Sequence, residues 1–122
     1  MSIYGHYTSQ YYGNSIIFPE ESFLISGISF CKENCKNINY DSELTMIMKE
    51  NIYDKEAIYI YNEDKHIGFV PNIEKTKTLC KNHITEPLKI INIKPVNNNI
   101  GIRVIPKALY VKNAILEEQL CF

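Results

Sequence analysis

The chain has 122 residues, of which 45% are hydrophobic and 22% charged, and these proportions are ordinary for one globular domain rather than a disordered segment. The formal net charge is −1 and Arg103 is the only arginine, which excludes tight, indiscriminate duplex binding, because that affinity comes from many Lys and Arg side chains. The chain opens without a signal-peptide pattern and has no run long enough for a membrane span, so we expect an intracellular protein, cytoplasmic or nuclear, without a membrane partner.

The cysteines and the known catalytic motifs argue against a metal site or an enzyme. Cys31 and Cys35 are four residues apart, but no second close pair of Cys or His completes a zinc site. We therefore expect Cys31, Cys35, Cys80 and Cys121 to be reduced, partly buried thiols, with metal binding as the alternative. The sequence lacks the nucleophile-elbow, zinc-protease, Walker and dinucleotide-binding motifs, so we expect a non-catalytic protein without a cofactor.

Residues 1–22 form a Tyr-rich, polar extension with no clear period. Gly and Asn residues in it predict turns, and Ser15–Phe18 is a candidate short strand. The tyrosines could pack over one end of the fold or contact a partner protein, or they could stack on bases. The segment is treated as an N-terminal extension of the main domain.

The next segments predict β structure. Phe23–Phe30 has the composition of a strand in which Gly27 marks a bulge or a close backbone approach. The polar residues 31–41 predict a loop. Alternating apolar and polar residues over Leu44–Lys49 then predict a half-buried strand.

The centre of the chain predicts a loop followed by a hairpin. Glu50–Glu56 interrupts the alternation, and Ala57–Tyr61 restores it. The polar residues 62–65 predict a turn, His66–Val70 the returning strand, and Pro71 the end of that strand.

A helix is expected after this hairpin. Asn72 is placed as its N-cap and the helix spans Ile73–Asn82, with apolar residues at helical spacing. A second hairpin follows, with strands Leu88–Val96 and Ile100–Ile105 around residues 97–99, and Lys112–Leu120 is a candidate C-terminal helix.

Strands outnumber helices and follow one another through short turns, so they should be mainly antiparallel. The predicted fold is mainly β with short helices, a small OB-like, partly open antiparallel β-barrel of about six strands with one or two α-helices. A two-layer α+β sandwich is the alternative. The predicted organisation is an extension at 1–22, a barrel domain at 23–110 and a C-terminal helical tail at 111–122.

Several side chains near the central loop are candidates for ligand contacts. Asp54 fits a turn-forming acceptor of backbone N–H groups, and it also fits an acceptor for a sugar hydroxyl. Tyr53 fits a base-stacking platform or an ordinary rim residue. Gly68, in mid-strand, indicates either a bulge or large neighbour, or a nucleotide laid against the sheet. His66 and Phe69, with Lys75 and the other helix lysines, could form a basic, aromatic pocket or a simple solvated face.

Two segments together resemble the HIRAN domain, a small β-rich module. The first is Glu50-Asn51-Ile52-Tyr53-Asp54-Lys55-Glu56-Ala57-Ile58, similar to the family's acidic-Asn-x-Tyr-Asp-x-x-Ala-Ile signature, and the second is Ile67-Gly68-Phe69-Val70-Pro71. The likeness runs from about Phe23 to about Leu109 and includes the opening strand with Gly27. It implies an OB-like barrel that recognises the 3′-terminal nucleotide of single-stranded DNA.

The resemblance also assigns roles to residues. It implies that Asp54 accepts a hydrogen bond from the terminal 3′-hydroxyl, that Tyr53 and Phe30 hold the last bases, that Asn51 fixes the terminal nucleotide and that Phe69 lines the pocket. Three positions depart from the family pattern: Ile52 replaces a Pro, Ser29 replaces a basic residue and Lys49 replaces an Arg.

The expected function is therefore a non-catalytic module that binds 3′ ends of single-stranded DNA within a replication, repair or transcription assembly. Its expected protein partners are DNA-processing proteins such as a helicase, nuclease or polymerase complex. The alternative is a protein-interaction or structural module on the same barrel with a degenerate DNA pocket. The full set of candidate DNA-binding residues is Phe30, Asn51, Tyr53, Asp54, His66, Phe69 and Lys75.

Overall fold

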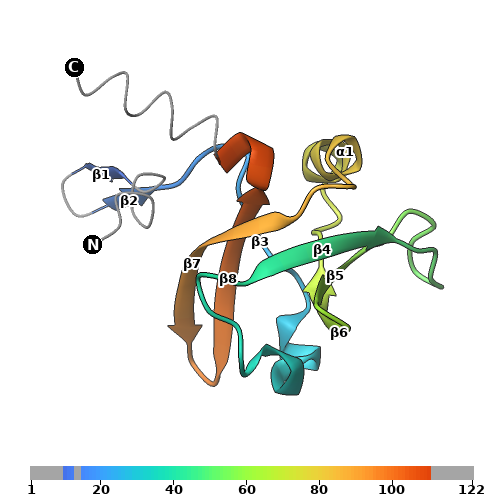
Figure 1. Ribbon diagram of the computed structural model, residues 1–122, viewed down its shortest axis with the longest axis horizontal. Helices are drawn as coiled ribbons and strands as arrows, with labels where there is room; N and C mark the ends of the chain where they lie inside the picture. Colours follow the sequence, from blue (N-terminus) through green and yellow to red (C-terminus); the bar gives the residue numbers. More distant parts are fainter. Residues whose placement is uncertain (1–9, 13–14, 111–122) are drawn as a thin grey trace.

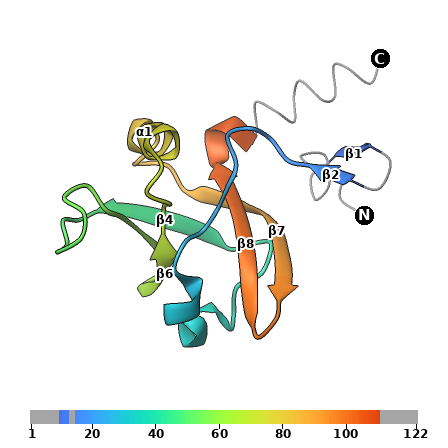
Figure 2. The same ribbon diagram turned by 180° about the vertical axis from the view of Figure 1, so that it is seen from behind.

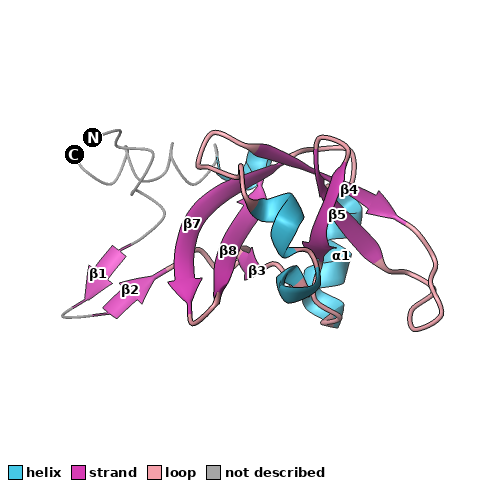
Figure 3. Cartoon of the chain, turned by 90° about the horizontal axis from the view of Figure 1, so that it is seen from below, coloured by secondary structure: helices cyan, strands magenta, loops and turns pink. Residues whose placement is uncertain are grey.

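The computed structural model describes residues 10–12 and 15–110, and its main feature is a curled, six-stranded antiparallel sheet in the order β3-β8-β7-β4-β5-β6 (Figure 1). A separate two-stranded sheet joins β1 to β2. Seen from below, β7 and β8 form one side of the curl and β4 and β5 the other (Figure 3). The strands are β1 (Gln10–Tyr12), β2 (Ser15–Ile17), β3 (Phe23–Leu24), β4 (Glu43–Met48), β5 (Ile58–Asn62), β6 (Lys65–Phe69), β7 (Leu88–Val96) and β8 (Asn99–Pro106).

This architecture confirms the predicted class, a mainly β protein with a small, partly open barrel and short helices. Successive side chains along a strand point to opposite faces of the sheet, so one face of each strand lines the interior of the barrel. Leu44 and Met46 of β4 point inward, as predicted, whereas Met48 at the strand end is exposed. The fully buried interior is mostly branched aliphatic, with Ile58, Ile60, Ile67, Leu88, Ile90, Ile102 and Val104 at its centre.

Both predicted hairpins are confirmed. β5 and β6 pair around residues 63–64, where Glu63 has a φ of 58°, and β7 and β8 pair around residues 97–98, where Asn97 has a φ of 56°. The second turn is shorter than expected, because Asn99 already belongs to β8. Asn accepts positive φ more readily than most residues, which suits it to this position.

The strand predicted over Phe23–Phe30 is mostly wrong. β3 covers Phe23–Leu24, and Ser26 forms an isolated bridge with Phe69 of β6. Gly27 then adopts a left-handed conformation with a φ of 77° and begins a 3₁₀ turn, η2 (Ile28–Phe30). The chain therefore leaves the sheet at Gly27 instead of bulging, and the other expectation, a close backbone approach, is confirmed, because a Cβ at Gly27 would lie 3.2 Å from Phe69 Cδ2. Part of the predicted 31–41 loop is a second 3₁₀ turn, η3 (Lys32–Cys35).

Residues 25 and 26 bring the two edges of the curled sheet together. The Ile25 amide donates to the carbonyl of Ile102 in β8 at 2.9 Å, while Ser26 and Phe69 exchange two backbone hydrogen bonds of 2.8 Å each. This crossing needs close approach at Gly68, where an added Cβ would lie 2.5 Å from Ile25 Cγ2 and 2.7 Å from the Ser26 carbonyl oxygen. Gly68 is thus explained by a neighbouring chain segment, as one of the two interpretations expected.

The predicted helix exists as α1 (Glu74–Asn82), but Asn72 is not its N-cap. Ile73 holds the cap position, has an extended backbone and makes no side-chain capping bond. The Ile73 amide instead donates to the Pro71 carbonyl at 2.8 Å, which delays the first helical turn by one residue. Ile73 is 58% exposed, while Lys77 and Cys80 are the buried positions of the helix.

At the chain ends, β2 confirms a strand near Ser15–Phe18, and β1 was not predicted. Residues 107–110 are helical, and the helix predicted over 112–120 lies outside the described residues. None of the helices in the described part of the chain is long and apolar enough to cross a membrane.

Candidate functional site

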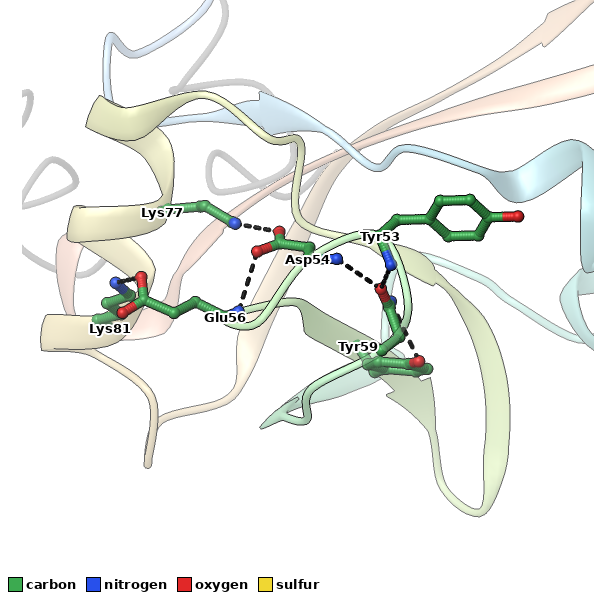
Figure 4. Close-up of polar contacts among 7 residues, drawn as sticks. Tyr53, Asp54, Glu56, Tyr59, Lys77 and Lys81 are labelled. Carbon is green, nitrogen blue, oxygen red and sulfur yellow. Dashed lines mark hydrogen bonds and ion pairs between the residues drawn. The ribbon is translucent and has the colours of Figure 1, made fainter.

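The loop between β4 and β5, residues 49–57, projects from the barrel (Figures 1 and 2) and is held by its own side chains. The Lys49 amide donates to the Ala57 carbonyl at 2.8 Å and closes the base of the loop. Asn51 Oδ1 accepts the amides of Tyr53 at 2.9 Å and Asp54 at 2.8 Å, and the Asn51 amide donates to the Asp54 carbonyl at 3.0 Å (Figure 4). Asn51 thus sets the backbone of the loop tip.

Tyr53 stands out from this ordered tip. Its side chain points away from Asp54 and from α1 (Figure 4), and Ile52 and Tyr53 are each 89% exposed. Exposure of two adjacent large apolar side chains on a hydrogen-bonded loop indicates a contact surface, because folding alone gains nothing from it.

Asp54 is the most constrained polar residue of the loop. Its Oδ1 accepts the Glu56 amide at 2.9 Å, and its Oδ2 forms an ion pair with Lys77 Nζ (Figure 4). The Lys77 hydrogen bond, followed by that from Glu56, lowers the pKa of Asp54 below its ordinary value. Asp54 is thus a turn-forming acceptor, as one of the two interpretations expected, and it is ionised at neutral pH.

The helix α1 holds the loop through two lysines. Lys77, whose side chain is 11% exposed, pairs with Asp54, and Lys81 pairs with Glu56 one helical turn later. Sequence reasoning put Lys75 in the site, but Lys75 Nζ lies 2.5 Å from Glu20 Oε1, in the segment before β3. Which of the helix lysines meets the loop depends on the rotation of α1 against the barrel, so spacing alone did not single out Lys77.

Next to the loop lies a cluster of rings that we call the aromatic face: Tyr59 and Tyr61 of β5 with His66 and Phe69 of β6. The ring centroids are 4.9 Å apart for Tyr59–His66, 4.7 Å for Tyr59–Phe69, 4.7 Å for His66–Phe69 and 5.4 Å for Tyr61–His66. All four are half-buried on the outer side of the sheet, because their neighbours Ile58, Ile60 and Ile67 fill the barrel.

Asn51 and Lys49 join the loop to the aromatic face. Asn51 Nδ2 donates to the Tyr59 hydroxyl at 3.3 Å, so the residue that orders the loop tip also contacts the first ring of the face. Lys49 Nζ lies 5.7 Å from the centroid of the Tyr59 ring and adds a cation there. Sequence reasoning missed Tyr59 and Tyr61 as site residues, although their alternation with Ile58 and Ile60 was the signal for their outward direction.

The opposite border of the aromatic face is formed by η2. Cys31 Sγ lies 3.8 Å from His66 Nδ1, and His66 Nε2 donates to the Gly68 carbonyl at 2.8 Å, which orients the imidazole. Gly27 lies against Phe69, since a Cβ there would be 3.2 Å from Phe69 Cδ2. Phe30 is the last residue of η2, directly before Cys31, and its side chain is 90% exposed.

Of the seven candidate residues, the structure brings three together: His66 and Phe69 on the aromatic face, and Asn51, which contacts it through Tyr59. Tyr53 and Asp54 lie in the same loop with side chains that point in different directions, and Phe30 is the last residue of η2. The seventh, Lys75, lies with Glu20. The surface offers rings, backbone and amide donors, and a few cations, which suits stacking and hydrogen bonding to an unpaired base and sugar.

The described cysteines are free thiols, as expected. Burial raises the pKa of Cys35 to about 11 and that of Cys80 to about 12, so both are neutral at physiological pH. Within residues 10–12 and 15–110, no three His, Cys, Asp or Glu side chains gather in a way that could hold a metal ion. Cys121 lies outside the described residues.

Comparison of the chain with models of protein families, with curated proteins and with solved structures found no match in any of the three.

Proposed function

We propose that this chain is a non-catalytic, HIRAN-like module that binds the free 3′ end of single-stranded DNA. It acts within a replication, repair or transcription assembly, in which a partner such as a helicase, nuclease or polymerase catalyses the reaction. The observation that carries the proposal is the exposed Tyr53 on a loop that Asn51 ties directly to the aromatic face. The resemblance of Glu50–Ile58 and Ile67–Pro71 to the HIRAN signatures gives separate support.

Stacking supplies most of the binding energy in this proposal. A base on an aromatic side chain gains about 1–3 kcal/mol, and every base has a face to stack. Tyr53 stacks on the terminal base, and Phe69, His66 and Phe30 offer further rings to the bases before it. With a net charge of −1, long-range attraction to phosphates is weak, so contact at the end matters more than contact along the strand.

Asp54 supplies the end specificity. A carboxylate has about four lone-pair directions, and Glu56 and Lys77 each take one, so an acceptor direction stays open for a 3′-hydroxyl. The Asp54 side chain is 23% exposed, which gives a ligand access. Lys77 keeps the carboxylate ionised and offsets its repulsion of the DNA backbone.

The test is fluorescence anisotropy with a short, 5′-labelled single strand that ends in a free 3′-hydroxyl, compared with the same strand ending in a 3′-phosphate, at low and moderate salt. We expect the hydroxyl end to bind more tightly. Tyr53→Ala should weaken binding by about 1–3 kcal/mol, or about five- to 150-fold in Kd.

The matched control is Leu24→Ala, which removes another exposed apolar side chain, 50% exposed and on β3 instead of the site. It should leave the Kd unchanged. Equal affinity for the two ends, or equal losses in the Tyr53 and Leu24 variants, would refute the proposed function.

A further inference from the structure

The 3₁₀ turns η2 and η3 and the turn of the β7–β8 hairpin lie at the end of the barrel away from α1 (Figures 1 and 2). A groove is lined by residues of these segments and of the chain next to them. We call it the isoleucine groove, because Ile28, Ile38, Ile93 and Ile100 line it. Its volume is about 460 Å³, within the range of ligand-binding clefts. It shares no lining residue with the loop 49–57 or with the aromatic face.

The apolar lining of the groove selects an aliphatic ligand. None of its lining residues is aromatic, whereas unpaired bases are usually held by stacking on rings. Ile38, Ile93 and Ile100 are only partly buried and lie against the main core cluster, so their exposed methyl groups are open to a further apolar group. Branched aliphatic side chains such as Leu, Ile or Val suit such a surface.

Three asparagines add a polar part to the lining: Asn97, Asn98 and Asn99, of which Asn97 and Asn98 are exposed. An amide side chain both donates and accepts hydrogen bonds. This part of the lining therefore suits the N–H and C=O groups of a peptide backbone that lies beside the isoleucines.

The charges around the groove specify the rest of the ligand. Lys32 and Lys36 line it, and none of its lining residues is acidic. Lys36 is paired with Glu33 at 2.8 Å, both side chains being largely exposed, while Lys32 makes no ion pair within the described part of the chain. The groove is therefore complementary to a negatively charged partner.

From these three features we propose that the isoleucine groove is a peptide-docking site, which takes a short segment of a partner protein with aliphatic side chains flanked by Asp or Glu. An aliphatic side chain of the segment contacts the isoleucines, its backbone lies against the asparagine side chains, and its carboxylates face Lys32 and Lys36. The site is separate from the proposed DNA surface, so the two ligands bind at the same time.

The test uses the full chain as bait for a phage library of random short peptides, followed by anisotropy with labelled synthetic copies of the enriched peptides. We expect enrichment of aliphatic residues flanked by Asp and Glu. Selection against the double variant Lys32→Glu, Lys36→Glu should enrich Lys and Arg in place of the acidic residues. A selection whose charge preference does not follow the lysines refutes the proposal.

Asn98→Asp separates docking from folding. Asn98 is exposed in the β7–β8 turn and lines the groove, so the variant should melt near the wild-type temperature, while its new carboxylate should repel the acidic peptide and weaken binding about tenfold. Tyr53→Ala should leave peptide affinity unchanged, and a 3′-hydroxyl oligonucleotide should not compete. Unchanged affinity in the Asn98 variant, or competition by the oligonucleotide, would assign the selected peptides to another surface and overturn the proposal.

Discussion

Replacing Gly68 with alanine tests the closure of the barrel. The new methyl group would sit 2.5 Å from Ile25 Cγ2 and 2.7 Å from the Ser26 carbonyl oxygen, well inside van der Waals contact. The Ile25 side chain can rotate, but the Ser26 carbonyl cannot move without breaking the paired hydrogen bonds with Phe69, each 2.8 Å long. We therefore expect Gly68→Ala to separate residues 25–26 from β6.

The expected loss of stability follows from these contacts. Two backbone hydrogen bonds contribute about 1–3 kcal/mol together, and overpacking a well-filled interior costs about 1–3 kcal/mol. Against this, an ordinary Gly→Ala change within a strand gains about 0.5–1 kcal/mol. The free energy of unfolding should fall by about 2–4 kcal/mol, a large part of the 5–15 kcal/mol typical of a domain.

The assay is urea unfolding followed by far-UV circular dichroism, with the midpoint and the m-value compared between variants. Ser26→Ala is the matched control, because the Ser26 side chain is exposed and only its backbone forms the bridge. It should stay near wild-type stability. A Gly68→Ala protein that is as stable as the wild type, or more stable, would refute the account of the closure.

Two further predictions concern the loop 49–57. Asn51→Ala removes the acceptor of two backbone amides and the hydrogen bond to the Tyr59 hydroxyl. It should lower the affinity for single-stranded DNA in anisotropy, and it should lower the free energy of unfolding in urea by only about 1–2 kcal/mol. Asn51→Asp keeps the acceptor and should recover most of the affinity. Because the folded-state pKa of Asp54 is lowered, its contribution to stability is complete above the ordinary value of 3.8 and is lost as pH falls through the lowered one. Lys77→Met removes the main cause of that shift, so its unfolding midpoint should depend less on pH in this acidic range; an unchanged pH dependence would contradict the assignment.

The sequence by itself determined the elements that depend on local pattern. The alternation in Ala57–Tyr61 and His66–Val70, with a polar turn between them, predicted β5 and β6. Strict alternation would put Phe69 on the same face as the buried Ile67, and the register shift between Ile60 and Tyr61 is what places it on the outer side. The same reasoning located β4 and the β7–β8 hairpin. It also placed Asn51, Tyr53 and Asp54 in one loop, because residues that are adjacent in a short connection cannot be far apart in space.

The tertiary structure decided what depends on contacts between distant segments. From the sequence, Gly27 indicates a bulge or a close backbone approach. The structure shows the close approach, to Phe69, at the point where the chain turns away after crossing from β8 to β6. From the sequence alone, Gly68 is compatible with a large neighbour or with a ligand contact, and the structure places Ile25 and Ser26 against it. Phe69, beside Gly27, and Ile25 and Ser26, beside Gly68, are each more than 40 positions away from that glycine in the sequence.

The choice among the helix lysines follows the same logic. Helical periodicity says that Lys77 and Lys81 share a face and that Lys75 lies on another, but it does not say which face meets the loop. Burial of Cys80 in the core sets the rotation of α1, and that rotation brings Lys77 to Asp54 and Lys75 to Glu20. Local propensity is a property of neighbouring residues, whereas the site is assembled by the packing of a helix against a barrel, and only the folded chain contains that information.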